Sequence, residues 1–203
     1  VRWVLGTVLE CTHWPVPPMG QECNLVAERG MVICVAGQIG SGAIEVLRAL
    51  AGLAADATGE VSVAGQTVRL RSVAKSQAAK VQFISEDRAG EGIFLRLSVG
   101  QNLVATKLSD HSRFGILEHR GLRAAASRLA SAVGVDLKRL RSHADELSGG
   151  NQQKLAFGRC IGGEDSGVLL MNEPTRGVDV GARAEIYRLI RQFCDRGYCL
   201  IMA

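Results

Sequence analysis

A glycine-rich turn between an apolar run and a helical pattern constrains the fold of this chain more than any other feature. The stretch VICVAGQIGSGAIEVLRAL, residues 32–50, predicts a buried strand, a tight turn and a helix. Backbone N–H groups at such a helix start can hold a phosphate, and the pattern G-x-x-x-x-G-K-[ST] adds a Lys for the outer phosphates and a hydroxyl for Mg²⁺. Gly37 and Gly42 fit this pattern, but Ala43 and Ile44 stand where the Lys and the hydroxyl belong.

The same loop, which also contains Gly40 and Ser41, is compatible with a dinucleotide-binding turn. That fold needs an acidic residue at the end of the next strand, about 20 residues on, to hold a ribose. Glu60 begins the next predicted strand instead of ending it. We therefore disfavour the dinucleotide interpretation.

Apolar runs alternate with helical patterns, which indicates an α/β fold with a parallel sheet. Strands are expected at 2–10, 31–36, 60–64, 81–85, 168–172 and 198–202, and helices at 44–53, 121–133, 151–161 and 182–193. Between Phe94 and Glu146 the strand signal disappears, which predicts a helical subdomain of about residues 95–146 inserted into one domain over residues 1–203. Because the chain starts at Val1 and stops inside an apolar run at Ala203, we expect a fragment truncated at its C-terminal end.

The composition is that of a globular protein, with 47% hydrophobic and 22% charged residues. We expect no membrane span, because no apolar run reaches the roughly 18 residues that one needs. A net charge of +4, without basic runs interleaved with aromatics, argues against a nucleic-acid groove. The six cysteines lack C-x-x-C spacing and are expected to be buried, reduced thiols: Cys11, Cys23, Cys34, Cys160, Cys194 and Cys199.

A second glycine turn opens a helix far along the chain, in ADELSGGNQQKLAFGRC, residues 144–160. The Ser148 hydroxyl and the N–H groups of Gly149 and Gly150 would lie at the positive end of the helix dipole, which suits an anion. The plainer alternative is that Ser148 only caps the helix.

The following stretch, GVLLMNEPTRGVDVGARAEIY, residues 167–187, is an apolar strand that ends in Asn172 and Glu173. Such a strand delivers polar groups to the edge of the sheet where ligands bind in α/β folds. Glu173 would orient or deprotonate a water there, whereas the plainer alternative is a solvated carboxylate. The two stretches in this order favour a functional site.

LSGGNQQK resembles the signature motif of ATP-binding cassette (ABC) transporter ATPases, in the variant found in importers of ribose, galactose, arabinose and similar sugars. NEPTRGVDVGAR is similar to that group's DEPTRGVDVGA, and ISEDRAGEGIFLRLSVGQNL resembles its VPEDRK…G…LSV..N segment. The resemblance runs from about Asn24 to the end of the chain, and residues 1–22 match only loosely. GQIGSGAIE is similar to the phosphate loop GLxGAGRTE of the second cassette of these ATPases, but it has lost even the Arg.

The resemblance implies a P-loop NTPase-like ABC cassette with a mostly parallel sheet core and an inserted helical subdomain. In this family two cassettes stack head to tail, and each ATP lies between the phosphate loop of one and the signature of the other. The chain would therefore give its signature, residues Leu147–Gln152, to a site whose phosphate loop belongs to a partner cassette, with ATP and Mg²⁺ mainly there. Its own loop would form a weaker site, and intrinsic ATPase activity of the isolated chain is doubtful.

Further roles follow from the resemblance, residue by residue. Asn172 stands where the family has an Asp that supports Mg²⁺, and an amide brings no negative charge. Glu86 stands where most cassettes have a Gln that links the γ-phosphate and Mg²⁺ to the membrane subunit. Asp179 matches the loop through which the two cassettes sense each other, and Glu173 is the candidate general base. The resemblance assigns adenine stacking to Trp14 or His13, for which packing is an equal alternative.

The resemblance implies a sugar importer's nucleotide-binding domain on the cytoplasmic face of the bacterial inner membrane. Its partners would be a second cassette, membrane permease subunits and, indirectly, a periplasmic sugar-binding protein, with no nucleic acid. One rival is a non-hydrolysing regulatory or structural nucleotide-binding module, favoured by Ala43, Ile44 and Asn172. A second rival, a soluble ABC ATPase acting on DNA or ribosomes, is disfavoured by the sugar-type motifs and the mild charge. The transported substrate is not encoded in these residues.

Overall fold

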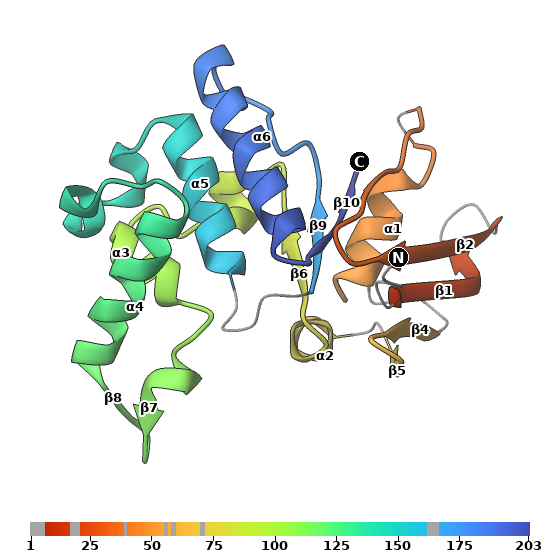
Figure 1. The fold of residues 1–203 in the computed structure, drawn as a ribbon, viewed down its shortest axis with the longest axis horizontal. Coiled ribbons are helices and arrows are strands. Elements are labelled where there is room, and N and C mark those ends of the chain that lie inside the picture. The colour runs from red at the N-terminus through yellow and green to blue at the C-terminus, as the bar shows by residue number, and fades with distance from the viewer. Residues whose placement is uncertain are drawn as a thin grey trace, which may run out of the picture. The chain divides into compact units, whose positions relative to one another are not determined.

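The chain folds into two compact units, shown in Figure 1. Unit 1 comprises Val1–Ile84, Gly162–Glu173 and Ile190–Ala203, and unit 2 comprises Ser85–Ile161 and Pro174–Leu189. The structure, a computed structural model, describes residues 7–16, 21–38, 40–54, 57, 60–69, 72–161 and 167–203. In this part of the chain no helix is both long and apolar enough to cross a membrane.

Unit 1 contains a parallel sheet with the strand order β3-β10-β9-β6. Its strands are β3 (Val32–Cys34), β10 (Cys199–Met202), β9 (Val168–Met171) and β6 (Val81–Ile84), and every neighbouring pair is parallel. All four residues of β9 are buried, which explains its continuous apolar sequence. The carboxyl ends of the four strands share one edge of the sheet, so the predicted α/β class with a parallel sheet is confirmed.

A second, antiparallel sheet in unit 1 has the strand order β2-β1-β4-β5. It consists of β1 (Thr7–Val16), β2 (Gln21–Glu28), β4 (Glu60–Val63) and β5 (Gln66–Arg69). β2, β5 and this sheet were not predicted from the sequence. It placed the first strand at 2–10, of which residues 2–6 lie outside the described part, while β1 continues to Val16.

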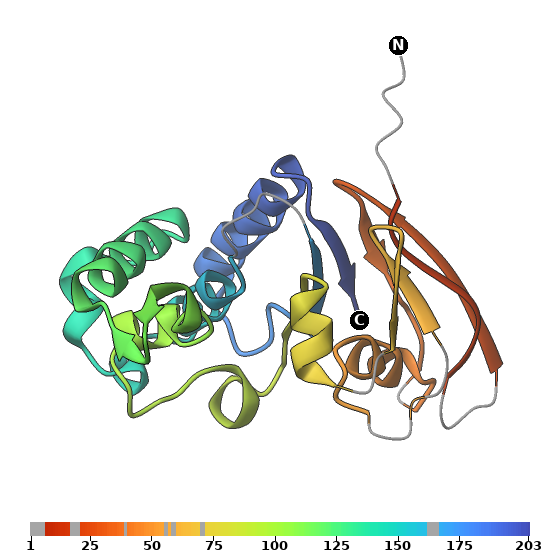
Figure 2. The same cartoon turned by 90° about the horizontal axis from the view of Figure 1, so that it is seen from below.

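Helix α1 (Ala43–Leu50) joins both sheets of unit 1 in one hydrophobic core, and Figure 2 shows it beside the antiparallel strands. Leu47 and Leu50, four and seven residues into the helix, are fully buried in a cluster that also holds Val61 of β4 and Leu170 of β9. Each such leucine contributes about 1.5–3 kcal/mol of transfer free energy. This packing fixes the helix start that follows the glycine loop. Helix α2 (Val73–Ala78) completes the helices that lie wholly within unit 1 of the described chain.

Unit 2 is mainly helical. It contains α3 (Val99–Val104), α4 (His119–Ala132), α5 (Gly149–Cys160) and the first part of α6 (Val180–Asp195), with short turns at Arg88–Gly92 (η1), Ser109–His111 (η2), Leu137–Arg141 (η3) and Ala144–Glu146 (η4). Ser98 and Gln101 form a capping box that starts α3. A hairpin of β7 (Ser112–Arg113) and β8 (Ile116–Leu117) interrupts the region where the sequence predicted no strand.

The longer predicted elements are confirmed, with shifts of a few residues at their ends. The helices expected at 44–53, 121–133, 151–161 and 182–193 correspond to α1, α4, α5 and α6. Helices α2 and α3 were missed because six residues give less than two turns of periodicity. Unit 2 is larger than the predicted subdomain of residues 95–146, since it also includes α5.

The described cysteines are free thiols, as predicted, but not all are buried. Cys11, Cys160 and Cys199 lie in the core, whereas Cys194 is half-buried. Cys34 is exposed at the last position of the short strand β3, so its predicted burial is wrong. The side chain of Cys23 lies outside the described residues.

Candidate functional site

The glycine loop between β3 and α1 has the backbone geometry of a tight turn. Gly40 and Gly42 have φ angles of 84° and 87°, which favour glycine. Ser41 N donates to Gln38 O over 2.9 Å, and no side chain caps α1 at Gly42. A Cβ atom on Gly37 would collide with the Ser41 side chain. The loop therefore requires its glycines, and no side chain competes for the first N–H groups of α1.

The first two residues of α1 offer no group for a phosphate besides their backbone. Ala43 is half-buried and Ile44 is 39% exposed. An exposed isoleucine at a helix start supplies neither a cation nor a hydroxyl. The lysine and hydroxyl positions of the motif therefore offer only backbone N–H groups.

Asn172 and Glu173 follow β9 at the carboxyl edge of the same sheet. Asn172 N donates to Ile84 O over 2.9 Å, its side chain is 3% exposed, and its Oδ1 has no hydrogen-bond partner among the described residues. Glu173 is exposed and has a φ of 40°, a sparsely populated value for a residue with a Cβ. Its N–H donates to Ala203 O over 3.0 Å, which ties the β9 end to the β10 end. Strain at a candidate base is typical of functional positions.

Neither Ile44 nor Asn172 offers Mg²⁺ a charged oxygen. Mg²⁺ prefers several oxygen ligands, with carboxylates to offset its charge. Ile44 has no oxygen in its side chain, and Asn172 contributes a neutral one. Within the described ranges, no group of three or more His, Cys, Asp or Glu residues could hold a metal ion.

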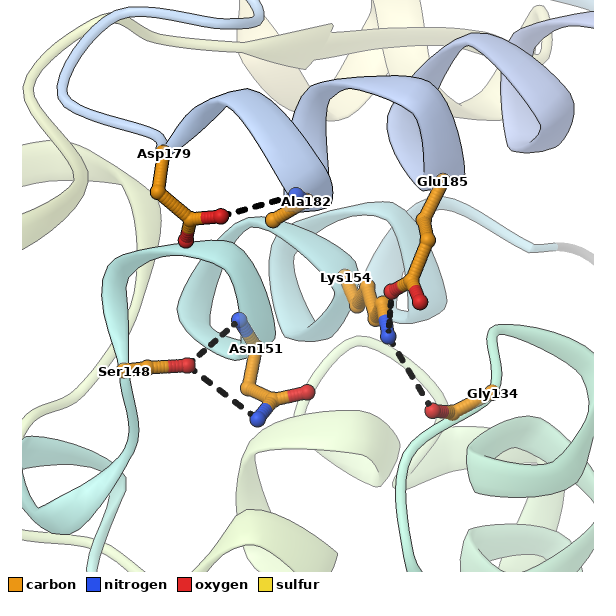
Figure 3. Close-up of polar contacts among 7 residues, drawn as sticks. All are labelled: Gly134, Ser148, Asn151, Lys154, Asp179, Ala182 and Glu185. Atoms are coloured by element: carbon orange, nitrogen blue, oxygen red, sulfur yellow. Dashed lines mark hydrogen bonds and ion pairs between the residues drawn. The ribbon is translucent and has the colours of Figure 1, made fainter.

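The second candidate site is the signature turn in unit 2, residues Leu147–Gln152, drawn in Figure 3. Ser148 is exposed, and its Oγ accepts from Asn151 N at 3.5 Å and from Asn151 Nδ2 at 3.2 Å. Leu147 is buried and anchors the turn, while Gln152 Nε2 donates to Ala144 O over 3.2 Å. The helix cap that the sequence offered as the plainer role of Ser148 is present. The turn is nevertheless open to solvent at Ser148.

Two glycines of the signature turn are also required for packing. A Cβ atom on Gly149 would lie 2.8 Å from Gly177 O. One on Gly150 would lie 2.5 Å from the Cβ of Ala182 in α6. From the sequence, these glycines were assigned a role only through their N–H groups, and this close approach was not predicted.

Asp179 lies at the start of α6, next to these contacts. Its Oδ1 accepts from Ala182 N over 2.9 Å, as Figure 3 shows, and the side chain is exposed. The predicted interface residue therefore caps α6 within the chain. Because Gly150 packs against Ala182, the starts of α5 and α6 are adjacent.

Three charged residues that the sequence analysis did not single out join the elements of unit 2. Arg176 Nη1 pairs with Glu86 Oε2. Lys154 Nζ of α5 pairs with Glu185 Oε2 of α6 and donates to Gly134 O over 3.4 Å (Figure 3). The hydrogen bond and charge of Lys154 hold the pKa of the Glu185 carboxyl below its ordinary value. Lys154 is the last residue of the LSGGNQQK motif, and its place in the motif was the only sequence signal that could have pointed to a role for it.

The predicted site residues thus fall into two groups. The phosphate loop (Gly37, Gly40, Ser41, Gly42, Ala43 and Ile44), Asn172 and Glu173 belong to unit 1. Glu86, the signature turn and Asp179 belong to unit 2. The side chains of Trp14 and His13, predicted to stack on adenine, lie outside the described residues.

Comparisons with known proteins match residues 21–176 to the family described as ABC transporter. The chain is 40% identical over 181 residues to the ribose import ATP-binding protein RbsA 1 of Streptomyces avermitilis, covering 89% of this chain and 34% of the relative. It is 36% identical over 185 residues to the galactose/methyl galactoside import ATP-binding protein MglA of Treponema pallidum, covering 91% of this chain and 37% of that protein. The chain spans about a third of the length of these relatives.

Solved structures support the fold. The ADP conformation of MJ1267, an ATP-binding cassette of an ABC transporter, superimposes with a TM-score of 0.78 at 17% identity and covers 97% of this chain and 81% of that one. CbiO1 from Clostridium perfringens, part of the ABC transporter complex cbiONQ, gives a TM-score of 0.75 at 17% identity, with 97% and 78% covered. At this identity the likeness concerns the fold alone.

Proposed function

Because the chain belongs to the ABC transporter family, we propose that it is the nucleotide-binding domain of an ATP-driven sugar importer whose signature turn completes an ATP site on a second cassette. The relatives are ribose and galactose/methyl galactoside import ATP-binding proteins, which supports a sugar as the transported substrate. The partners in this proposal are the second cassette, permease subunits and a periplasmic sugar-binding protein, with no nucleic acid. The chain would act at the cytoplasmic face of the bacterial inner membrane.

One contrast carries the proposal. The signature turn has its serine and both glycines at an exposed helix start. The phosphate loop of the same chain, by contrast, has Ala43 and Ile44 at the positions of the lysine and the hydroxyl residue. A chain that keeps only the signature half can still complete a site whose other half lies on a partner. A composite site on the partner would therefore explain both the missing lysine and hydroxyl of the phosphate loop and the intact signature turn.

In this mechanism the Ser148 hydroxyl and the N–H groups of Gly149 and Gly150 donate to the outer phosphates of ATP held by the partner cassette. The positive end of the α5 dipole favours the phosphate charge. The two cassettes close when these donors engage and reopen after hydrolysis, and this cycle drives the permease. Mg²⁺ at the composite site would be bound by the partner and would offset phosphate charge.

The chain's own phosphate loop forms a weaker site in this proposal. A missing charge-assisted contact costs about 1.5–3 kcal/mol, or roughly ten- to a hundredfold in binding. Glu173 remains the candidate base, but Ala43, Ile44 and Asn172 leave it without the groups that support hydrolysis. The alternative function, a non-hydrolysing regulatory or structural module, rests on these same three residues.

A negative charge introduced at the signature turn distinguishes the composite ATP site from the non-hydrolysing module. Gly149→Asp is unsuitable because any side chain there meets Gly177 O. Ser148→Asp and Ser148→Asn are better, since both side chains cap a helix and Ser148 is exposed. They differ by one negative charge, so the Asn variant is the matched control.

The measurement is ATP turnover of the complete importer, with both cassettes and the permease. If the outer phosphates bind here, turnover of Ser148→Asp should be at least about tenfold below that of Ser148→Asn, as the loss of a charged hydrogen bond implies. Equal turnover of the two variants would reject the composite site and favour the regulatory module. Thermal unfolding of both variants checks that they are folded to the same extent.

A further inference from the structure

Arg88 connects three segments of unit 2 that the proposed ATP site needs. Its Nη1 donates to Gln153 Oε1 of α5 over 3.1 Å and to Arg176 O over 2.6 Å. Its Nη2 lies beside the signature turn, because a Cβ atom on Gly149 would be 3.7 Å from it and one on Gly177 would be 3.0 Å from it. One guanidinium thus touches the signature helix and the loop that precedes α6.

The segment that carries Arg88 is itself fixed at several points. The side chain of Arg176 forms an ion pair with Glu86, two residues before Arg88. Asp87 Oδ1 accepts from Gly90 N over 2.9 Å and closes the following turn. Arg88 is half-buried, so its bonds are partly shielded from water. The planar guanidinium makes both hydrogen bonds through Nη1 and fixes the directions of its N–H groups in a way that a lysine ammonium does not.

Gln153 gives an independent reason to assign a role to this contact. Its side chain is 1% exposed, and its Nε2 has no hydrogen-bond partner among the described residues. A buried donor without a partner lowers stability. The amide at this position is therefore poorly suited to stability, and its oxygen serves as the acceptor for Arg88.

We infer that Arg88 is a positioning residue, which holds the signature turn in register with the loop of residues 174–179 that ends at Asp179. This inference rests on the proposed function above. Arg88 acts through Gln153 and the carbonyl of Arg176 and does not itself need to contact ATP. Both faces that this chain would present to its partner, the signature and Asp179, then move as one body.

The test uses the complete importer and four substitutions. Arg88→Met removes the donors and keeps an unbranched apolar stem, Arg88→Lys keeps the charge without the planar guanidinium, and Gln153→Met removes the side-chain amide that contains the acceptor. Arg96→Met is the matched control, because Arg96 is an exposed arginine of the same unit. The readouts are kcat and KM for ATP, the amount of ATP bound without hydrolysis, and the unfolding temperature.

We expect kcat to fall about tenfold in Arg88→Met, nearly as far in Arg88→Lys and severalfold in Gln153→Met. The signature engages only in the closed state, so KM and the amount of bound ATP should change less than twofold. Gln153→Met should keep its unfolding temperature because it removes the unpaired buried amide, which separates positioning from a purely structural role. The double variant Arg88→Met/Gln153→Met should be no worse than Arg88→Met alone.

Any of the following results overturns the inference: kcat of Arg88→Met equal to that of Arg96→Met, full turnover in Arg88→Lys, or losses in the double variant that multiply. A fall in kcat that is matched by an equal fall in bound ATP also overturns it, since that pattern reports unfolding. If Ser148→Asp and Ser148→Asn turn over ATP equally, the proposed function fails first. If that pair differs and the Arg88 variants behave like Arg96→Met, only the positioning role is rejected.

Discussion

Gly150 in α5 and Ala182 in α6 are so close that a Cβ atom on Gly150 would lie 2.5 Å from the Cβ of Ala182. Neither atom belongs to a flexible side chain, so the helices themselves have to separate to admit it. We predict that Gly150→Ala destabilises the chain by about 1–3 kcal/mol through overpacking. Chemical denaturation followed by circular dichroism measures this difference.

Gly181→Ala is the control for this substitution. Gly181 is exposed in the first turn of α6, and a Cβ atom there would meet only Asp179 Oδ1, at an ordinary 3.4 Å. Alanine is better than glycine in a helix by about 0.8–1 kcal/mol, so this variant should be neutral or more stable. Equal stability of the two variants would show that the α5–α6 contact is looser than described.

The Lys154–Glu185 pair predicts a pH-dependent contribution to stability. Lys154 lowers the pKa of Glu185 in the folded chain, so the contribution is fully present above the ordinary value of 4.5 and is lost as the pH falls through the lower folded pKa. The Glu185 side chain is 43% exposed, which limits the pair to about 0.2–1 kcal/mol. Glu185→Gln should lose this amount at neutral pH, and its difference from the unmodified chain should shrink as the pH falls below 4.5 and through the lower folded pKa.

Asp195→Asn controls for the general effect of removing an acidic residue from α6. Asp195 is 69% exposed and lies 3.8 Å from Arg191 Nε one turn earlier, so its removal should change stability by less than about 0.5 kcal/mol. A pH profile of Glu185→Gln parallel to that of the unmodified chain would contradict the prediction.

The cysteines should differ strongly in reactivity. Burial raises the pKa of the Cys160 thiol to about 11 and that of Cys199 to about 12, so little thiolate forms at pH 8. Cys34 is exposed and accessible to reagent. Alkylation of the folded chain with iodoacetamide, read by mass spectrometry of peptides, should label Cys34 while Cys160 and Cys199 stay unmodified. Labelling of all three in denaturant is the control, and rapid native labelling of Cys160 would be inconsistent with its burial.

The sequence predicted the elements whose residues all share one environment. Val168–Met171 is apolar throughout because every residue is buried, so β9 was predictable from its composition. β2 was not, because its described side chains alternate between the exposed and the inner face while the apolar Val26, 54% exposed, breaks the matching polar–apolar alternation in the sequence. The structure of β2 depends on pairing with β1. The register of this pair is interrupted by two irregularities, which no local sequence pattern predicts.

The candidate site divides in the same way. The cap at Ser148 is a local feature, three residues from its partner Asn151, and the sequence contains the whole of it. The Arg88–Gln153 bond joins positions 65 apart, and the Glu86–Arg176 pair joins positions 90 apart. No local pattern links positions so far apart in the sequence, so these contacts required the fold. The close packing at Gly149 and Gly150 was not predictable for the same reason, because the neighbouring atoms belong to residues distant in the sequence.

The phosphate loop offers a gain-of-function prediction. Its backbone already forms the turn and leaves α1 without a side-chain cap, so only the chemical groups are missing. Ala43→Lys with Ile44→Ser restores a cation and a hydroxyl, and the 203-residue chain should then bind ATP about ten- to a hundredfold more tightly. The matched control is Ala43→Gln with Ile44→Ser, which adds similar length without charge. Titration with a fluorescent ATP analogue, with and without Mg²⁺, measures both variants. Equal affinities would mean that this loop does not hold phosphate, because a lysine at a competent loop gains a charged contact that a glutamine does not.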